Sequence, residues 1–381
     1  MTIVVVPFRK LIDNIVDRAR KCGIECVEWT ENVTDPARLV FVSADKVESS
    51  FLLYAQGHCD KGRVQRIFVD ECHVTFTQSD WRPKLSRLRV VRSFRVPLIL
   101  LTATLPRVLE IELEFNMQLP VARYIRAATT RAKTQYMVVK VEAGTLIEEA
   151  LGLCRRKREQ LEVGEKGVVY SKSRDECKKL AQKLGCYHHH AGLVDDEDRL
   201  QEWLKHGGLI VATSALGTGV DYPGIVFTVH VDVPYGLIDF SQESGRAGRA
   251  GEDVDSIIIV EKGKAERVKG GASGVDLGIM CEFITTGGCR RAVLSRYFDG
   301  LETRCGEGLA RCDGCGEGIT VLEKRTQRTA LEREFVEETL DEIAQDGCAI
   351  CFVGTIDGAT TDGWTHPGRD YIRWEGDEQR V

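Results

Sequence analysis

The sequence predicts an α/β protein with two parallel-sheet units and a small, cysteine-rich helical module. Over the first 265 residues, short apolar runs alternate with longer amphipathic stretches, which is typical of α/β layers. Several runs are apolar throughout, as expected for parallel strands that are covered on both faces. A polar break at Arg123–Thr134 separates two such units, and a Gly-rich break at Lys262–Gly274 precedes the cysteines.

The apolar runs and amphipathic stretches give the expected elements. The expected strands are Ile3–Val6, Leu39–Val42, Ile67–Val69, Leu98–Leu101, Gly167–Tyr170, Leu209–Ala212, Val226–Val231 and Ser256–Val260. The expected helices are Lys10–Lys21, Asp175–Leu184 and Glu197–His206. Further on, we expect a helix over Thr326–Gln345 and little regular structure in the last 35 residues. The predicted domains span 1–125, 126–265, 266–320 and 321–381.

Composition argues against two classes of protein and leaves the binding partner open. The 381 residues suggest two or three domains. No apolar run approaches the roughly 18 residues of a membrane span, and the opening MTIVVVPFRK predicts a buried strand instead of a signal peptide. The net charge of −6 comes from residues 321–381, which hold 14 acidic and 7 basic side chains. Phosphate binding depends on local basic patches, so this charge does not exclude nucleic acid.

The 14 cysteines are unevenly distributed. A cluster within 35 residues contains Cys281, Cys289, Cys305, Cys312 and Cys315. Without a signal peptide, clustered cysteines more often hold a metal ion than form disulfides. Free thiols without a metal are the alternative.

The sequence IFVDECH at Ile67–His73 predicts an apolar strand that ends in two carboxylates. Open α/β sheets bind ligands at the carboxyl ends of their strands. There, Asp70 can hold Mg²⁺ on ATP phosphates, and Glu71 can orient or deprotonate the attacking water. The alternative is a helix N-terminus whose acidic residues lie near the positive end of the dipole.

A second apolar strand, in LILLTATLP at Leu98–Pro106, ends in two threonines. The hydroxyls of Thr102 and Thr104 can bond the carboxylates of the neighbouring strand and pass their state to a partner site. A cap or a turn is the alternative.

In the second unit, DFSQESGRAGRAGE at Asp239–Glu252 presents Gln242, Arg246 and Arg249. We expect the two arginines, three residues apart, to share one face of a helix. In that position they can stabilise the charge that develops in phosphoryl transfer. A solvated basic helix is the alternative.

Taken together, DECH, TAT, ATSALGTGVD and QESGRAGR resemble motifs II, III, V and VI of superfamily-two helicases, in order and in spacing. VVVPFRKL, LVFVSADKV and KGVVYSKSRDECKKLAQKL resemble motifs Ia, Ib and IV. Within the superfamily, the sequence is most similar to the RecQ family of DNA helicases, over about residues 1–320. This resemblance implies two RecA-like domains that use ATP to unwind duplex DNA 3′–5′ along single-stranded DNA. It also implies a nuclear location and roles in DNA repair and recombination.

The resemblance assigns roles to individual residues. As catalytic residues around ATP and Mg²⁺ it implies Asp70, Glu71, His73, Gln242, Arg246 and Arg249, with His73 linking the carboxylates to motif III. As further nucleotide-binding residues it implies Thr102, Thr104, Gly217, Gly219 and Asp221. As contacts to nucleic acid it implies Thr213, Trp81 and Arg82, the last two in QSDWRPKLSRL, which resembles the aromatic-rich loop of RecQ proteins. Burial of Trp81 against its own sheet is the alternative.

The stretch Cys289–Cys315 resembles the small zinc module of RecQ proteins. The resemblance implies Zn²⁺ in a closed tetrahedral site formed by Cys289, Cys305, Cys312 and Cys315, with Cys281 as a substitute ligand. The spacing departs from the usual two CxxC steps, because six residues separate Cys305 from Cys312. A second metal site can begin with Cys348, Cys351 and His366, but no fourth ligand follows.

One motif of a helicase motor is missing. Such a motor needs a GxxxxGK[ST] loop whose Lys reaches the β- and γ-phosphates, and the sequence contains none. We therefore expect an amino-terminally truncated motor with an incomplete first domain and no ATPase activity alone. The alternatives are a non-enzymatic DNA-binding remnant and an RNA helicase of the same superfamily.

Overall fold

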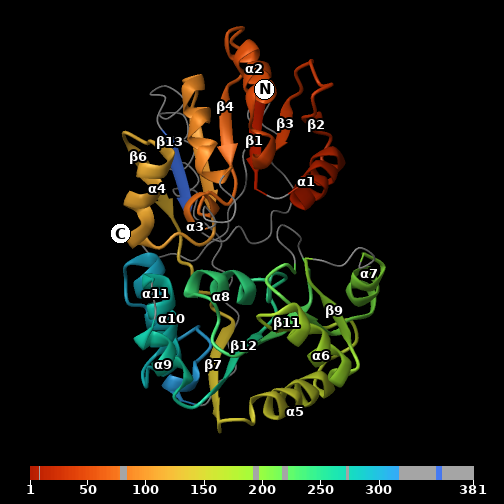
Figure 1. Ribbon diagram of the computed structural model, residues 1–381, viewed down its shortest axis with the longest axis vertical. Helices are drawn as coiled ribbons and strands as arrows, with labels where there is room; N and C mark the ends of the chain where they lie inside the picture. The colour runs from red at the N-terminus through yellow and green to blue at the C-terminus, as the bar shows by residue number, and fades with distance from the viewer. Residues whose placement is uncertain are drawn as a thin grey trace. The chain divides into compact units, whose positions relative to one another are not determined.

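The structure is a computed structural model, and it describes residues 1–7, 9–77, 84–191, 197–216, 222–271, 274–316 and 349–353. The chain divides into two compact units. The first contains Met1–Thr129 and Thr326–Val381, and the second contains Thr130–Arg325. Each unit has helices packed around a parallel sheet (Figure 1), so the predicted α/β class with two parallel sheets is confirmed.

Unit 1 contains a seven-stranded parallel sheet in the order β2-β3-β1-β4-β5-β13-β6. Its strands are β1 (Thr2–Val6), β2 (Cys26–Glu28), β3 (Leu39–Ser43), β4 (Arg66–Val69), β5 (Leu98–Thr102), β6 (Ala122–Arg126) and β13 (Ala349–Val353). Its α-helices are α1 (Arg9–Lys21), α2 (Ser49–Cys59), α3 (Val74–Thr77) and α4 (Glu110–Met117). Short 3₁₀ segments lie at Ala44–Lys46, Leu85–Phe94 and Arg107–Leu109.

The strands of unit 1 are apolar throughout because the sheet is covered on both faces. Along β1, Ile3 and Val5 pack into the larger core, whereas Val6 packs with α1 on the opposite face. The larger core also contains Trp29 and Phe51, whose rings meet edge to face at 5.2 Å. Side chains of a strand point alternately to its two faces, so both sets of residues must be apolar.

Strand β13 comes from the far end of the chain and lies inside the sheet of unit 1. It is the blue arrow among the orange strands of Figure 1. Ala349–Val353 pairs in parallel with Leu98–Thr102 on one side and with Ala122–Arg126 on the other. The prediction that the last 35 residues contain little regular structure is therefore wrong for these five. The predicted helix over Thr326–Gln345 lies outside the described residues.

Unit 2 contains a six-stranded parallel sheet in the order β7-β12-β11-β8-β10-β9. Its strands are β7 (Thr134–Val141), β8 (Lys166–Tyr170), β9 (Tyr187–His189), β10 (Gly208–Ala212), β11 (Ile225–Val231) and β12 (Val254–Glu261). Its α-helices are α5 (Leu146–Glu159), α6 (Arg174–Leu184), α7 (Glu197–His206), α8 (Leu237–Ser244), α9 (Lys264–Gly270), α10 (Val275–Thr285) and α11 (Arg290–Asp299). A single 3₁₀ turn, Asp313–Cys315, is described among the clustered cysteines.

Two of the expected breaks are partly structured. β6 covers the first four residues of Arg123–Thr134 and β7 begins at its last residue, and α9 lies within the Gly-rich stretch Lys262–Gly274. In both cases tertiary contacts stabilise a regular element that its local composition disfavours. β7 pairs along its whole length with β12, and Ala265 of α9 is buried.

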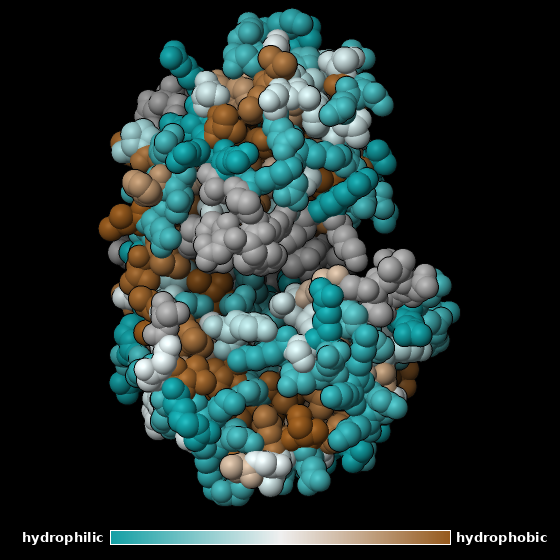
Figure 2. Space-filling model, viewed as in Figure 1, coloured by the Kyte–Doolittle hydropathy of each residue, from teal (hydrophilic) through white to brown (hydrophobic). Residues whose placement is uncertain are grey.

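No helix of the described residues is long and apolar enough to cross a membrane. The face drawn in Figure 2 is mainly hydrophilic, with apolar side chains exposed in limited patches. Among the exposed apolar residues are Ile111 and Phe115 of α4.

A proline in β13 tests whether this strand is part of the sheet. Because β13 has a neighbour on both sides, Ile350→Pro removes a ladder N–H and distorts the pairing. We expect the free energy of unfolding of unit 1 to fall by at least about 2 kcal/mol, measured by urea denaturation. The control is Cys26→Pro in β2, an edge strand. Residues on either side of Cys26, such as Glu25 and Trp29, make the backbone hydrogen bonds to β3, so a proline at position 26 removes none of them. Equal stability of Ile350→Pro and the wild type would contradict the role of β13.

Candidate functional site

The carboxyl ends of β4 and β5 bring the DECH and TAT sequences together. The buried ring of His73 has Nδ1 2.8 Å from Oγ1 of Thr102. Oε2 of Glu71 lies 3.3 Å from the same nitrogen. The N–H of Thr104 donates to Oγ1 of Thr102 at 3.2 Å. The histidine, and not a carboxylate, is therefore the direct partner of the Thr102 hydroxyl.

The backbone turns sharply between the two carboxylates. Glu71 has a φ of +47°, in the left-handed region that residues other than glycine rarely adopt. Its N–H donates to Oδ1 of Asp70 at 2.9 Å, and the N–H of Asp70 donates to the carbonyl of Val5 at 2.9 Å. Backbone strain of this kind often occurs at functional sites. Here it accompanies the contact of the Glu71 carboxylate with His73.

The electrostatics of this turn suit a cation. Burial, with the neighbouring Glu71 carboxylate, raises the pKa of Asp70 to about 7. A divalent cation at the carboxylates would oppose that shift, because a positive charge favours the ionised form. Burial lowers the pKa of His73 to about 4, so its ring is neutral at pH 7. With its proton on Nδ1, the ring can donate a hydrogen bond to the Glu71 carboxylate, which when ionised can only accept hydrogen bonds.

The two predicted arginines lie in turns, so the expected shared helical face is wrong. α8 carries Gln242 and ends at Ser244. The turns that follow, Gly245–Ala250, are called here the arginine segment, since they contain Arg246 and Arg249. Gly248 has a φ of +74°, and a Cβ at that position would lie 2.7 Å from the Val254 side chain. The helix cannot continue through such a glycine.

Both arginines lie close to the end of β8. Burial raises the pKa of Tyr170, and the positive charges of Arg246 and Arg249 act in the opposite direction. The Tyr170 hydroxyl donates to the carbonyl of Glu243 on α8 at 3.4 Å. The backbone of the arginine segment itself lies against the amino ends of strands, because the N–H of Gly248 donates to the carbonyl of Ile225, the first residue of β11, at 3.0 Å.

Several predicted site residues belong to parts of the chain that the structure does not describe. Trp81, Arg82, Gly217, Gly219, Asp221, Cys348 and His366 lie outside the described residues, and only the backbone of Cys351 is described. Thr213 is described: it follows β10, and its N–H donates to the carbonyl of His189 at 3.1 Å.

Four of the clustered cysteines converge in unit 2. The Sγ atoms of Cys289, Cys305, Cys312 and Cys315 all lie within 4.8 Å of one another, and this set is called here the cysteine cluster. Cys281 is buried in α10 and is not part of it. Backbone N–H groups approach three of the sulfurs: Arg290 to Cys312 at 3.3 Å, Cys305 to Cys289 at 3.3 Å and Cys312 to Cys305 at 3.4 Å.

The cysteine cluster fits a tetrahedral metal ion. A Zn–S distance of about 2.3 Å implies sulfurs about 3.8 Å apart. The Sγ of Cys289 lies 3.6 Å from that of Cys305 and 3.9 Å from that of Cys312. N–H donors aimed at the sulfurs stabilise thiolates, the form that binds a metal. The residues present therefore suit Zn²⁺, with four protein ligands and no open position for substrate.

The loop of the cysteine cluster is anchored to the sheet by residues to which the sequence analysis assigned no role. Nη2 of Arg290 donates to Oδ2 of Asp313 at 2.8 Å, and the same oxygen accepts the N–H of Val138 in β7 at 2.9 Å. Gly314 is required because a Cβ there would lie 2.0 Å from the Gly288 carbonyl oxygen. The paired arginines after Cys289 were visible in the sequence, but their partners were not.

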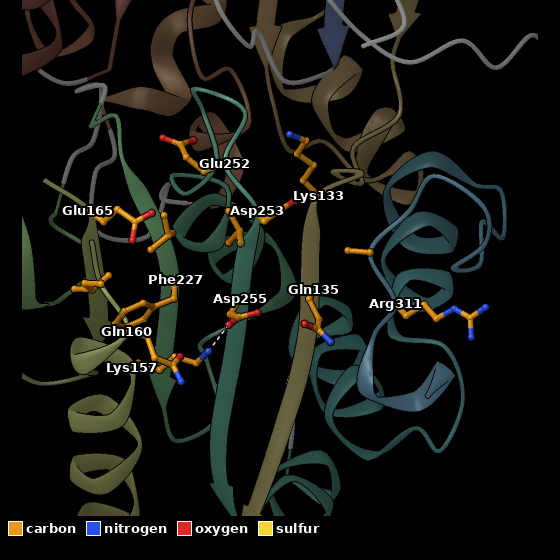
Figure 3. A pocket seen from close by; sticks show the side chains of 14 residues that line it. Lys133, Gln135, Lys157, Gln160, Glu165, Phe227, Glu252, Asp253, Asp255 and Arg311 are labelled. Carbon is orange, nitrogen blue, oxygen red and sulfur yellow. Dashed lines mark hydrogen bonds and ion pairs between the residues drawn. The ribbon is translucent and has the colours of Figure 1, made fainter. Parts of the chain in front are cut away.

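A cavity of about 590 Å³ lies at the amino edge of the unit 2 sheet. It is lined by residues at the amino ends of strands, such as Lys133 before β7 and Glu165 before β8. Figure 3 shows the ion pair between Lys157 and Asp255 within it. None of the predicted site residues lines this cavity. Since ligands of open parallel sheets bind at the carboxyl ends of the strands, it is not the candidate site.

The comparisons with known proteins agree with the fold and the motifs. Residues 146–251, which include the arginine segment, match the helicase conserved C-terminal domain. The putative ATP-dependent DNA helicase Q1 of Caenorhabditis briggsae is 26% identical, over 91% of this chain and 62% of that protein. The RecQ-like DNA helicase blm-1 of Caenorhabditis elegans is 26% identical, over 83% of this chain and 36% of that protein. The chain thus spans less than two thirds of the length of either relative.

Solved structures share the fold at low sequence identity. Dbp5 of Saccharomyces cerevisiae bound to RNA and ADP BeF3 aligns over 75% of each chain, with a TM-score of 0.55 and 15% identity. The helicase MrfA bound to DNA aligns over 70% of this chain and 41% of its own, with a TM-score of 0.54 and 16% identity.

The two parallel sheets and these neighbours define an α/β protein with two RecA-like units. The chain is similar to RecQ-like DNA helicases over most of its length, as the resemblance predicted.

Removal of the Thr102 hydroxyl tests the link between β4 and β5. Thr102→Val leaves His73 and the Thr104 N–H without their shared partner, so we expect a loss of about 1–3 kcal/mol in the free energy of unfolding. Urea denaturation measures the change. Ser93→Ala, which removes an exposed hydroxyl from the same unit, is the control and changes stability little. A Thr102→Val variant as stable as this control would contradict the contact.

Metal analysis tests the cysteine cluster. We expect about one equivalent of zinc per chain, and less than half an equivalent in Cys312→Ser, because a closed site needs four thiolates. The matched control is Cys281→Ser, which changes a nearby buried cysteine outside the cluster and retains the metal. Loss of zinc in Cys281→Ser with retention in Cys312→Ser would transfer the ligand role to Cys281.

Proposed function

We propose that this chain is the motor and zinc-module part of a RecQ-like helicase that couples ATP hydrolysis to 3′–5′ unwinding of DNA. The observation that carries the proposal is the arrangement of Glu71, His73 and Thr102 beside Asp70 at the carboxyl edge of a parallel sheet. The homology to DNA helicases supports the same function. A nuclear location and roles in repair and recombination follow from the family resemblance and stay predictions.

Each group of residues has a place in the proposed chemistry. Bound ATP with Mg²⁺ supplies the phosphoryl group that is transferred to water. Asp70 and Glu71 provide carboxylates for the cation and for the attacking water. Neutral His73 connects Glu71 to Thr102 and so to the TAT segment. Arg246 and Arg249 supply positive charge for the phosphates.

The absence of a GxxxxGK[ST] sequence limits what these 381 residues do alone. The amides and the lysine of that loop are the main cradle of the triphosphate. We therefore propose that the purified chain binds single-stranded DNA but does not turn over ATP. This outcome also describes the second candidate, a non-enzymatic DNA-binding protein, which the missing loop favours.

ATP turnover directly tests the proposal that the purified chain does not hydrolyse ATP. With and without single-stranded DNA, we expect the phosphate release of the wild-type chain to equal that of Asp70→Asn, because the triphosphate lacks its cradle. DNA-stimulated phosphate release that disappears in Asp70→Asn would show a complete motor and overturn the proposal that the chain does not hydrolyse ATP.

Nucleic-acid binding separates the remaining alternatives. We expect the chain to bind single-stranded DNA at least as tightly as RNA of the same sequence, with an affinity that falls as salt rises, because phosphate contacts release counterions. Fluorescence anisotropy at several salt concentrations measures both. A clear preference for RNA would favour the RNA helicase, and no binding to either would contradict the proposed partner.

A further inference from the structure

The buried guanidinium of Arg291 connects the cysteine cluster to the start of unit 2. Arg291 lies on α11, two residues after Cys289, and is fully buried. Its Nη1 donates to the carbonyl of Arg131 at 2.7 Å, and its Nη2 donates to those of Thr134 and Ala310 at 2.9 and 3.0 Å. Ala310 lies in the loop between Cys305 and Cys312, so this contact ties Arg291 to the cysteine cluster. A buried charge is tolerated only with such partners.

Arg131 continues this connection to the arginine segment. Its Nη1 donates to the carbonyl of Ala247 at 2.5 Å. Ala247 is fully buried and lies between the two predicted catalytic arginines, Arg246 and Arg249. A continuous series of hydrogen bonds therefore runs from Ala310, in the loop between Cys305 and Cys312, through Arg291 and Arg131 to the backbone that carries both arginines.

A second set of contacts holds α8, the helix that precedes the arginine segment. Oδ1 of Asp276 on α10 accepts the N–H of Ile238 at 3.2 Å, at the amino end of α8. Gly236 has no room for a side chain there, because a Cβ would lie 1.8 Å from Oδ2 of Asp276. Further along, the ring of Phe240 on α8 lies 5.1 Å from that of Phe283 on α10. The helices next to the cysteine cluster thus fix both the helix and the turns that follow it.

The arginine segment depends on such external contacts. It is built of turns, and its bonds to distant parts of unit 2 include the Arg131 contact and the N–H of Gly248 to the carbonyl of Ile225. A loop held mainly by tertiary contacts opens more readily than a helix or a central strand. The position of Arg246 and Arg249 is therefore sensitive to any change that moves Arg291 or Arg131.

We propose that Arg131 and Arg291 are positioning residues through which the metal-loaded cysteine cluster holds the arginine segment in place. The role of the segment in ATP hydrolysis rests on the proposed function, whereas the mechanical connection does not. Loss of the metal loosens the cysteine loop at Ala310, releases Arg291 and Arg131 in turn, and loosens the backbone at Ala247.

Amide hydrogen exchange of the full chain tests this connection without ATP or DNA. In Arg131→Ala, we expect the amides of residues 245–250 to exchange about tenfold faster, since a charge-assisted hydrogen bond is lost. The bound zinc should stay at the wild-type level, because the variant leaves Arg291 and the cysteines intact. Arg131→Lys, which keeps a cationic donor, should restore part of the protection. Arg155→Ala is the matched control, since Arg155 bonds the carbonyl of Lys183 elsewhere in unit 2.

Zinc chelation separates a connection from a merely local stabilising role. In the wild type, we expect chelation to accelerate exchange in residues 245–250 as well as around the cysteines. In Arg131→Ala, chelation should add little further exchange in residues 245–250, because the connection is already broken. Arg291→Lys, which keeps the charge but cannot make all of the carbonyl contacts, should resemble chelation.

Two results would overturn the proposal. One is wild-type protection of residues 245–250 in Arg131→Ala. The other is chelation that accelerates exchange only around Cys289–Cys315, or whose effect on residues 245–250 adds fully to that of Arg131→Ala. The expected exchange pattern in a chain that binds no single-stranded DNA would contradict the proposed function alone.

Discussion

The parallel pairing of β4 with β5 is the constraint on which the candidate site depends. Ile67 lies opposite Leu98, so the two strands end together and His73 reaches Thr102 across the edge of the sheet. No local preference fixes that distance, because the two residues are 29 positions apart. A shift in register would separate the histidine from the hydroxyl and leave a neutral, buried ring without its partner.

In unit 2, a comparable constraint comes from the cysteine cluster. Four sulfurs within 4.8 Å of one another repel as thiolates and need a cation to stay together. Around them, Arg290 and Arg291 reach Asp313 and backbone carbonyls, so the loop packs on the sheet as well as on the metal. A structural metal site of this kind contributes to folding as well as to local geometry.

The accuracy of the sequence predictions varied with the kind of signal. The eight expected strands agree with the described strands to within two residues, because continuous apolar runs in a doubly covered sheet leave few alternatives. The helical face expected for Arg246 and Arg249 was wrong, since α8 ends at Ser244 and turns follow, in which Gly248 has a positive φ that a helix cannot contain. β13 was missed because a five-residue strand has no periodicity that identifies its partners, which lie more than 200 residues away.

The sequence by itself determined the α/β class, the order of the motifs and the identity of the clustered cysteines, because these depend on residue type and spacing along the chain. Only the tertiary structure decided which side chains meet: His73 with Thr102, Arg131 with Ala247, and β13 with the interior of the first sheet. These contacts join residues far apart in the sequence. They are selected by the packing and hydrogen-bond satisfaction of the whole fold, which no short pattern encodes.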